Sequence, residues 1–396
     1  MSIVLFWVCV AGIAYTYVGF PLLLWLRAKL APSPFHIDLS ATPTVSVLIA
    51  AHNEAASIGA KLDNVLSLDY PRDRLQVIIA SDGSTDRTVE IARQFADERI
   101  QVLDLPRRGK AAALNASAPA CTGEVLVFSD ANSMFAPNAL RVLAGHLAEP
   151  NVGGVAGDQR YLSTAGSNEG ERRYWDFDRM LKRWQSAAGS VTSATGAIYA
   201  VRRDLFTTVP EGVTDDFAVS TAIVAAGRRL VFAENAVAYE PPAEAADAEF
   251  ARKVRIITRG LRGIAVRRVL LNPLRYGFYS LQLVSHKVLR RLVAVPLLVV
   301  AAISPWLWQS GLPYQLFVSA QAAFYVCALL GWQLRQTRAG RCKLFSLPFF
   351  FCLVNLASLL AFCNVLLGRR IVTWQPQRAG GAAIMTPITP VLEKTV

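Results

Sequence analysis

Polar side chains that could bind a nucleotide and a metal ion follow three short apolar runs of this sequence. The runs are followed by these residues: His52, Asn53 and Glu54 after 45–50, Asp82 after 75–80, and Asp130 with Asn132 after 124–129. In an open α/β sheet, ligands bind beyond the carboxyl ends of the strands. Oxygen ligands at a strand end suit Mg²⁺ or Mn²⁺ held jointly with substrate phosphates. The pattern therefore predicts a nucleotide and metal site at one edge of a sheet.

Each of these positions also has a structural interpretation. Asn53 could cap a helix, with Glu54 in the first turn. Asp82 could accept hydrogen bonds from a base or a ribose, while Asp86 caps the next helix. Lys110 could supply a cation to the same diphosphate, although a lone lysine usually lies on a solvated surface. The complete set in this order favours a binding site.

The elements that must position these residues alternate in type. The runs 45–50, 75–80 and 124–129 are rich in β-branched residues, and helical patterns lie between them at 55–66 and 85–96. Such alternation predicts an α/β fold with a largely parallel sheet and right-handed crossovers.

The composition indicates a membrane protein with a sizeable polar part. The chain has 396 residues, of which 53% are hydrophobic, and a formal net charge of +12. Its basic residues cluster beside apolar segments, where cations contact anionic lipid headgroups. No recognised nucleic-acid module accompanies the charge, so nucleic-acid binding is disfavoured. The six cysteines show no C-x-x-C spacing, so neither a zinc site nor a disulfide framework is suggested.

Four apolar stretches are long enough to span a membrane as helices. The first stretch, 1–26, is followed by Arg27 and Lys29, whereas a signal peptide carries its positive charge before the apolar stretch. It is therefore predicted to be a membrane anchor. The positive charges after it place the following chain in the cytosol. The others are 291–310, 314–334 and 344–367. The side of the membrane on which the C-terminal tail lies stays open. The count of spans places the tail outside, whereas the cations near 369 favour the cytosolic side.

These features divide the chain into six predicted parts. They are an N-terminal transmembrane helix at 1–27, a linker at 28–43, a cytosolic catalytic domain at 44–245, amphipathic interface helices at 246–290, a transmembrane bundle at 291–368 and a tail at 369–396. The interface helices are predicted from cation-rich amphipathic stretches that join the catalytic domain to the spans.

The sequence resembles the family 2 glycosyltransferases of the GT-A fold, in the membrane-bound branch with the cellulose, hyaluronan and poly-N-acetylglucosamine synthases. The most specific segments are 49–54, 80–86, 109–115, 129–132 and 213–217. The resemblance implies a Rossmann-like GT-A domain with a mostly parallel sheet, transmembrane helices and amphipathic interface helices. It also implies a nucleotide-sugar donor and a Mg²⁺ or Mn²⁺ cofactor.

The resemblance implies roles for individual residues. Ala50, His52 and Glu54 would line the nucleotide pocket, Asp82 would contact the base, Lys110 would lie near the diphosphate, and Asp130 with Asn132 would take the metal positions. Asn132 departs from the family, which has a second acid there. Asp216 would be the general base, with Asp215 in place of the family's glutamate, and Gly196 would lie in the acceptor segment.

A second departure concerns the Q-x-x-R-W element of chain-extending members. Arg255 matches its arginine and could hold the diphosphate, whereas Arg252 replaces the glutamine and Ile256 replaces the tryptophan that stacks on an acceptor sugar. Trp374 resembles a C-terminal tryptophan of some relatives.

The predicted function is an inverting glycosyltransferase of the bacterial cytoplasmic membrane, acting on a lipid-linked or glycan acceptor at the cytosolic face. Its expected partners are the nucleotide sugar, that acceptor and membrane lipids, with no nucleic acid. A processive polysaccharide synthase is the alternative, and a catalytically inactive scaffold or glycan-export partner is the alternative of another class.

Overall fold

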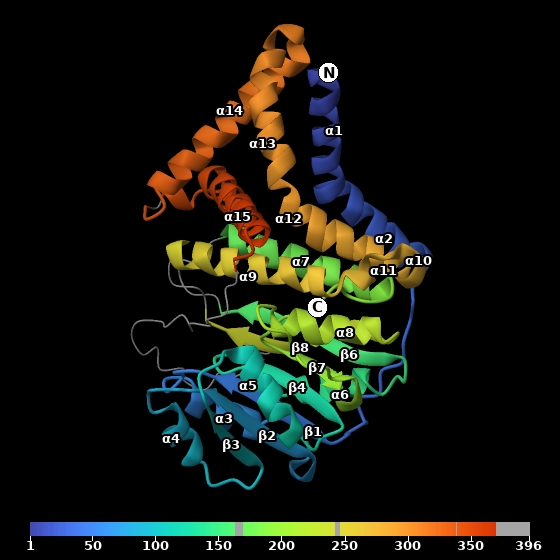
Figure 1. The fold of residues 1–396 in the computed structure, drawn as a ribbon, viewed down its shortest axis with the longest axis vertical. Coiled ribbons are helices and arrows are strands. Elements are labelled where there is room, and N and C mark those ends of the chain that lie inside the picture. Colours follow the sequence, from blue (N-terminus) through green and yellow to red (C-terminus); the bar gives the residue numbers. More distant parts are fainter. Residues whose placement is uncertain (163–168, 242–245, 338, 370–396) are drawn as a thin grey trace, which may run out of the picture.

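The computed structural model describes residues 1–162, 169–241, 246–337 and 339–369. Within these residues, an α/β layer built on one sheet lies beneath a group of long apolar helices (Figure 1). Helices α7 (Glu169–Ala187) and α9 (Ala246–Val266) run between the two parts (Figure 1).

The sheet has eight strands in the described residues, in the order β3-β2-β1-β4-β7-β6-β8-β5. Their bounds are β1 Val45–Ala51, β2 Leu75–Asp82, β3 Ile100–Leu105, β4 Val125–Asp130, β5 Met134–Phe135, β6 Val152–Tyr161, β7 Tyr199–Arg202 and β8 Arg229–Glu240. The first four strands in this order pair in parallel, whereas β7 is antiparallel to both of its neighbours. The prediction of a mostly parallel α/β sheet is confirmed.

The register of the parallel strands brings the predicted site residues to one edge. Ala50 in β1 is paired with Ala80 in β2 and with Asp130 in β4. Because parallel strands end on the same side, the segments that begin at His52, Asp82 and Asp130 emerge next to one another.

Helices cover both faces of the sheet. The apolar residues of α3 (Ile58–Leu66), α4 (Thr88–Arg93) and α6 (Ala139–His146) pack against one face. Helices α5 (Lys110–Ser117) and α8 (Asp215–Ala225) pack against the other face. The second core continues into Ile264 of α9 and into Tyr279 and Leu283 of α11 (Phe278–Leu283), so the sheet layer and the membrane-side helices share one apolar interior.

The predicted helices 55–66 and 85–96 are shorter than expected. They begin at Ile58 and Thr88. The residues that precede them form hydrogen bonds between the loop after β1 and the loop after β2, and do not continue the helices. Asn53 accepts hydrogen bonds from the backbone N–H of Thr85 and Asp86, at 2.7 and 3.3 Å. Asn53 adopts a φ of +56°, a left-handed conformation that asparagine tolerates better than most residues.

Three helices in the described chain are long and apolar enough to cross a membrane, or four if one bent pair is a single span. They are the N-terminal helix Ser2–Leu30, α14 (Leu312–Gln333) and α15 (Lys343–Leu366). The first contains α1 (Ser2–Ala14), a π-helical turn and α2 (Phe20–Leu30).

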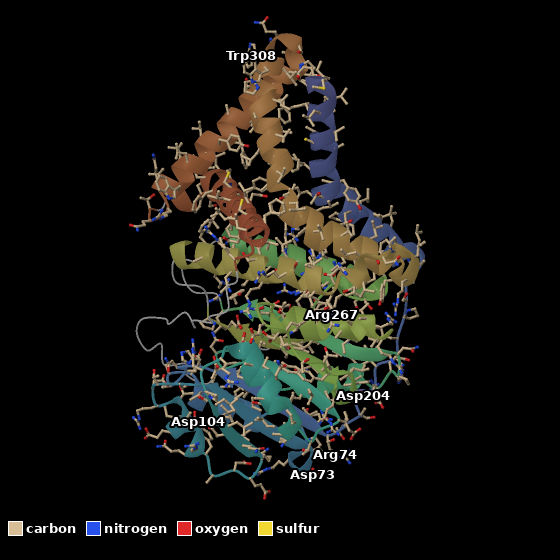
Figure 2. The ribbon with its side chains drawn as sticks, viewed as in Figure 1. Asp73, Arg74, Asp104, Asp204, Arg267 and Trp308 are labelled. Carbon is tan, nitrogen blue, oxygen red and sulfur yellow. The ribbon has the colours of Figure 1, made fainter. Side chains whose placement is uncertain are left out.

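The predicted span 291–310 differs from the structure. The bent pair is formed by Phe278–Leu292 and Ala294–Ser310, whose axes differ by 46°. Helix α12 (Arg290–Leu292) ends the first arm, and α13 (Ala294–Ile303) begins the second. Part of the segment predicted as interfacial therefore belongs to this candidate span. Figure 2 shows Trp308 at the far end of these helices, opposite Asp73, Arg74 and Asp104 on the sheet layer.

Candidate active site

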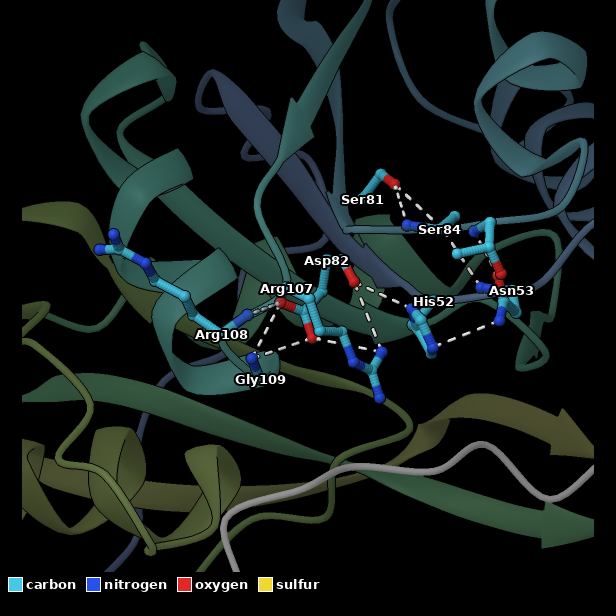
Figure 3. Close-up of polar contacts among 9 residues, drawn as sticks. His52, Asn53, Ser81, Asp82, Ser84, Arg107, Arg108 and Gly109 are labelled. Atoms are coloured by element: carbon cyan, nitrogen blue, oxygen red, sulfur yellow. Dashed lines mark hydrogen bonds and ion pairs between the residues drawn. The ribbon is translucent and has the colours of Figure 1, made fainter.

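Loops after β1 and β2 form the first part of the predicted site, and they are bonded tightly to each other. We call residues 51–57, 81–88 and 106–109 the β1–β2 edge. The ring Nδ1 of His52 lies 2.9 Å from the backbone oxygen of Asp82 (Figure 3). The backbone N–H of Glu54 donates to the hydroxyl of Thr88 at 2.7 Å. Glu54 also accepts a hydrogen bond from the Ser57 hydroxyl at 2.7 Å. These contacts hold His52 and Glu54 at the β1–β2 edge, and their place in the nucleotide pocket stays a prediction.

The carboxylate of Asp82 is completely buried at this edge. Its oxygens accept hydrogen bonds from the backbone N–H of Arg108 at 2.8 Å and of Gly109 at 2.9 Å, and Arg107 lies 3.6 Å away (Figure 3). The contact of Asp82 with a base, which the resemblance implies, stays a prediction. Asp82 fixes the loop that leads into Lys110.

The side chain of Ala50 is fully buried among the apolar residues of the sheet and α5. Its place in the nucleotide pocket stays a prediction. A small residue here allows α5 to pack close to β1, which positions the N-terminus of that helix.

The second part of the site is a charged cluster of Lys110, Asp130, Asp215 and Asp216, which we call the β4 edge. The ammonium of Lys110 lies 2.6 Å from an oxygen of Asp130 and 3.1 Å from an oxygen of Asp215. Burial alone would lower the pKa of Lys110, but the charges of Asp130 and Asp215 outweigh burial and raise the pKa. The lysine is therefore charged and joins β4 to the start of α8.

Gly196 belongs to this cluster. A Cβ at this position would lie 3.5 Å from an oxygen of Asp130 and 3.8 Å from the Lys110 ammonium. The backbone that precedes β7 thus lies next to the ion pair, and the role of Gly196 in acceptor binding stays a prediction.

Asp215 and Asp216 are the first two residues of α8. Asp215 accepts a hydrogen bond from the hydroxyl of Tyr199 at 3.3 Å. Burial and the charge of Asp215 raise the pKa of Asp216 above the ordinary aspartate value, although contacts with Thr214 and Phe217 oppose that shift. A carboxylate with a raised pKa is better matched to proton abstraction near neutral pH than an ordinary aspartate.

A cavity of about 960 Å³ opens at the β4 edge and extends to the helices above the sheet. Asp130, Asp215 and Asp216 line it together with Thr195 and Gly196. The hydroxyl of Thr195 is buried there without a hydrogen-bond partner in the protein. Acids of the sheet layer and side chains of apolar helices therefore face one enclosed space.

Two arginines of α9 differ in their position relative to the cavity. Arg252 and Ile256 line the cavity, whereas Arg255 is absent from its described walls. Residues four apart lie on the same face of a helix. Residues 252, 256 and 260 therefore share one face of α9, and residues 255 and 259 share a different face. Burial and the charges of Arg259 and Arg252 lower the pKa of Arg255.

Glu240 is a site residue that our sequence analysis missed. It ends β8, lines the cavity and accepts hydrogen bonds from Ser133 and Gln159, each at 2.5 Å. Burial and the charge of Asp130 raise its pKa. The signal was present in the sequence, because Glu240 follows an apolar run just as Asp130 does.

Lys61 was also missed, and its sequence context gives no signal. This lysine of α3 is fully buried, donates to the backbone oxygen of Ser133, and has its ammonium 3.8 Å from the ring centre of Phe135. Burial lowers its pKa to about 7, against the opposing charges of Asp130 and Glu240.

The residues of the β4 edge fit a divalent cation only if a ligand supplies further oxygens. Among the described residues, no group of three or more His, Cys, Asp and Glu side chains could hold a metal ion. Asp130 faces the cavity with 29% of its side chain exposed, and Asn132 is half-buried two residues later. One carboxylate and one amide leave most positions of a hard cation open to diphosphate oxygens. Trp374 lies outside the described residues.

Known proteins share this fold and sequence. The family described as Glycosyl transferase family 2 matches residues 46–209. The probable glycosyltransferase YdaM of Bacillus subtilis is 26% identical over 223 residues, which are 52% of this chain and 53% of that protein. The poly-beta-1,6-N-acetyl-D-glucosamine synthase of Staphylococcus epidermidis is 30% identical over 186 residues, 44% of each chain.

The beta-monoglucosyldiacylglycerol synthase of Nostoc sp. is 30% identical over 186 residues, 44% of this chain and 40% of that protein. The chain thus spans about half the length of the curated relatives that it matches, or less. A similar solved structure is the mannosyltransferase PcManGT from Pyrobaculum calidifontis in complex with GDP-Man and Mn2+. Its TM-score is 0.70 and its sequence identity is 25%, and the match covers 92% of this chain and 100% of that chain. These matches confirm the resemblance that the motifs indicated.

Proposed function

We propose that this chain, which carries a family 2 glycosyltransferase domain, transfers a sugar from a nucleotide-diphosphate sugar to a lipid-linked or glycan acceptor at the membrane surface. The observation that carries the proposal is the single cavity that joins Asp130, Asp215 and Asp216 to the apolar helices. A soluble acceptor needs no such connection, whereas an acceptor anchored in a bilayer must reach the carboxylates from that side.

Asp216 would act as the general base. It takes the proton of an acceptor hydroxyl while that oxygen forms a bond to the anomeric carbon and the bond to the diphosphate breaks, which releases the nucleoside diphosphate. Attack opposite the leaving group inverts the configuration at that carbon. The raised pKa of Asp216, caused by burial and Asp215, favours this role.

Asp130 and Asn132 would hold a Mg²⁺ or Mn²⁺ ion, which would neutralise the charge of the diphosphate. Mn²⁺ in the complex of PcManGT supports the choice of a hard divalent cation. Lys110 orients Asp130, because its ammonium contacts one carboxylate oxygen. His52 and Glu54 would lie along the nucleotide, and an arginine of α9, Arg255 or the cavity-lining Arg252, would contact the diphosphate.

The membrane location is the bacterial cytoplasmic membrane, with the sheet layer on the cytosolic side. The apolar helices, with exposed Trp7, Val8, Trp306 and Leu316, support insertion into a bilayer.

A processive polysaccharide synthase is the second candidate. The similarity to the poly-beta-1,6-N-acetyl-D-glucosamine synthase favours it. Ile256 on the cavity wall disfavours it, because an aliphatic side chain offers no flat aromatic face for a sugar ring. A ladder of products would support the synthase, and a single product band would support single addition.

The test uses the full chain in nanodiscs with Mn²⁺ or Mg²⁺, a panel of UDP-, GDP- and dTDP-sugars, and a bacterial lipid extract. Release of nucleoside diphosphate from one donor, with loss in Asp216→Asn and after chelation of the metal, is the expected result. Absence of both release and nucleotide binding for every donor would contradict the proposal and favour a scaffold or an export partner.

A further inference from the structure

The turn 130–133, which follows β4, is bonded to two buried ionisable side chains that have no role in the proposed transfer. The turn contains Asp130 and Asn132, the residues proposed to hold the divalent cation, and it ends at Ser133. Ser133 is completely buried, and its backbone N–H donates to the backbone oxygen of Asp130 at 3.2 Å. Any contact that fixes Ser133 therefore also fixes this turn.

Lys61 of α3 bonds to the backbone of Ser133. Its ammonium donates a hydrogen bond to the backbone oxygen of Ser133 and lies 3.8 Å from the ring centre of Phe135. Asn64, three residues later, donates to the backbone oxygen of Phe135 at 2.9 Å and accepts from its backbone N–H at 2.7 Å. Helix α3 therefore holds the segment 133–135 at both of its ends.

Glu240 bonds to the side chain of Ser133. The Ser133 hydroxyl donates to one carboxylate oxygen of Glu240, and the amide of Gln159 donates to the other, each at 2.5 Å. Glu240 is the last residue of β8, and Gln159 lies in the neighbouring parallel strand β6. Ser133 is thus joined to α3 through its backbone and to the sheet through its hydroxyl.

The helix that carries Lys61 also begins at the β1–β2 edge. The backbone N–H of Ile58, the first residue of α3, donates to the backbone oxygen of Glu54 at 2.9 Å. Lys61 lies about one turn further along the helix. Helix α3 therefore connects the loop proposed for the nucleotide to the turn proposed for the cation.

A lysine is costly on the buried face of α3. The buried residues of this helix are Ile58, Lys61, Leu62 and Val65, and the Lys61 side chain has no exposed surface. An apolar residue of similar volume usually packs at lower cost than a buried ammonium. Burial lowers the pKa of Lys61, and the charges of Asp130 and Glu240 oppose that shift, so both acids act on this ammonium. Residues that break the local pattern at such a cost are typical of functional sites.

We propose that Lys61 and Glu240 are positioning residues for the divalent cation of the donor complex. By holding Ser133 through its backbone oxygen and its hydroxyl, they fix the turn from which Asp130 and Asn132 bind that cation. The inference rests on the proposed function and assigns the residues that maintain its cation site.

Fixed orientation matters at this site because one of the two proposed protein ligands is uncharged. The amide oxygen of Asn132 attracts a hard cation less strongly than a carboxylate does. Ordering a flexible turn when the cation binds would cost conformational entropy, whereas a turn that is already held avoids that cost. Loss of a group that orients metal ligands typically lowers metal affinity by about 10- to 100-fold.

The test measures the Mn²⁺ concentration that supports nucleotide binding, a quantity that requires no turnover. The full chain in nanodiscs is titrated with UDP, GDP and dTDP by calorimetry, first in EDTA and then at increasing Mn²⁺ concentrations. We call the Mn²⁺ concentration that gives half of the rise in nucleotide affinity the Mn²⁺ midpoint. Wild type should show this rise for the nucleotide of its donor.

Ser133→Ala and Lys61→Met should each raise the Mn²⁺ midpoint about 10-fold. Nucleotide affinity in EDTA should stay within about twofold of wild type, because neither residue is proposed to contact the nucleotide. Saturating Mn²⁺ should restore kcat, since the variants weaken binding of the cation and leave Asp216 in place. Ser133→Ala keeps the backbone oxygen that Lys61 contacts, so it keeps the test decisive if Lys61→Met does not fold.

Ser46→Ala is the matched control for Ser133→Ala. Both serines are completely buried, and the Ser46 hydroxyl donates to Gln76 at 2.6 Å much as the Ser133 hydroxyl donates to Glu240. Ser46 lies near the start of β1, at the opposite end of the strand from the β4 edge. Ser46→Ala should lower the melting temperature by a similar amount and leave the Mn²⁺ midpoint unchanged.

A double variant tests whether Ser133 and Glu240 act through their shared hydrogen bond. Glu240→Gln should also raise the Mn²⁺ midpoint, because the neutral amide is a weaker acceptor for the Ser133 hydroxyl. The double variant Ser133→Ala, Glu240→Gln should raise it by less than the product of the two single effects, since both remove the same contact. Fully multiplicative effects would overturn the role of this contact.

A wild-type Mn²⁺ midpoint in both Ser133→Ala and Lys61→Met would overturn the inference and leave the proposed function standing. An equal loss of nucleotide affinity in EDTA and in Mn²⁺ would also overturn it, because the change would then be general damage to the site. If the wild-type chain binds no nucleotide under either condition, the proposed function is contradicted, and this inference with it.

Discussion

The β1–β2 edge and the β4 edge lie side by side at the carboxyl ends of parallel strands, and each presents an aspartate just where a strand ends. Asp82 ends β2, is fully buried, and is bonded to backbone N–H groups of the loop 106–109. Asp130 ends β4, contacts Lys110, and keeps 29% of its side chain exposed to the cavity. The same pattern in sequence thus yields one aspartate that holds a loop and one that faces the cavity.

The difference arises from the segments that pack against each aspartate. The chain after β3 turns back over Asp82 and supplies donors to it, so that carboxylate is satisfied internally. The chain after β4 leads away, and a side chain from α5 approaches instead. A carboxylate whose oxygens are taken up by backbone N–H groups stabilises the fold, whereas one that faces a cavity remains available for a ligand.

The largest effect is expected at the β4 edge. Asp216→Asn should lower kcat by about 10² to 10⁴-fold, the usual contribution of a positioned general base. Donor affinity should be unchanged, because Asp216 acts on the acceptor proton. Steady-state rates together with calorimetric donor binding measure both quantities, and a rate within threefold of wild type would exclude Asp216 as the base.

The next effect is on the free energy of unfolding at the β4 edge. Lys110→Gln removes the cation between Asp130 and Asp215 and should cost about 3–5 kcal/mol, since it leaves the buried carboxylate of Asp215 and the partly exposed carboxylate of Asp130 uncompensated. Chemical denaturation measures the change in the free energy of unfolding, and a loss below ~1 kcal/mol, the range of an exposed ion pair, would contradict this explanation.

A smaller loss is expected at the β1–β2 edge. Asp82→Asn should cost about 1.5–3 kcal/mol, because hydrogen bonds from two backbone N–H groups lose their ionised acceptor. Asp104→Asn is the matched control: it is exposed in the register position next to Ser81 and should change stability by less than ~0.5 kcal/mol. Thermal unfolding of both variants checks the contrast. Equal losses of stability in the two variants would show that burial of the carboxylate does not determine its contribution to stability.

The smallest effect is a shift of pH dependence at the β4 edge. Because burial and Asp215 raise the pKa of Asp216, the acid limb of kcat should rise with pH around a midpoint above 3.8, the ordinary aspartate value. An acid whose folded pKa is raised costs stability as pH rises through that pKa. The melting temperature of Asp216→Asn relative to wild type should therefore increase from pH 4 to pH 8, and a constant difference would contradict the raised pKa.

The amino-acid sequence by itself determined the alternation of strands and helices, the edge at which the acids gather, and the four apolar segments. Each of these follows from local patterns: residue type, period and the polar residue that ends an apolar run. Asp130, Lys110, Gly196 and Asp215 were predicted from their motifs, and the structure brings them together.

Only the tertiary structure decided what each of these side chains contacts. It assigned Asp82 to a loop, turned Ile256 toward the cavity, and bent the helix between 292 and 294. It also brought Glu240, the last residue of β8, into the site across 110 residues from Asp130 in the chain. Burial and charge at a position depend on segments distant in sequence, so local pattern predicts where an acid lies and the packing around it decides what it does.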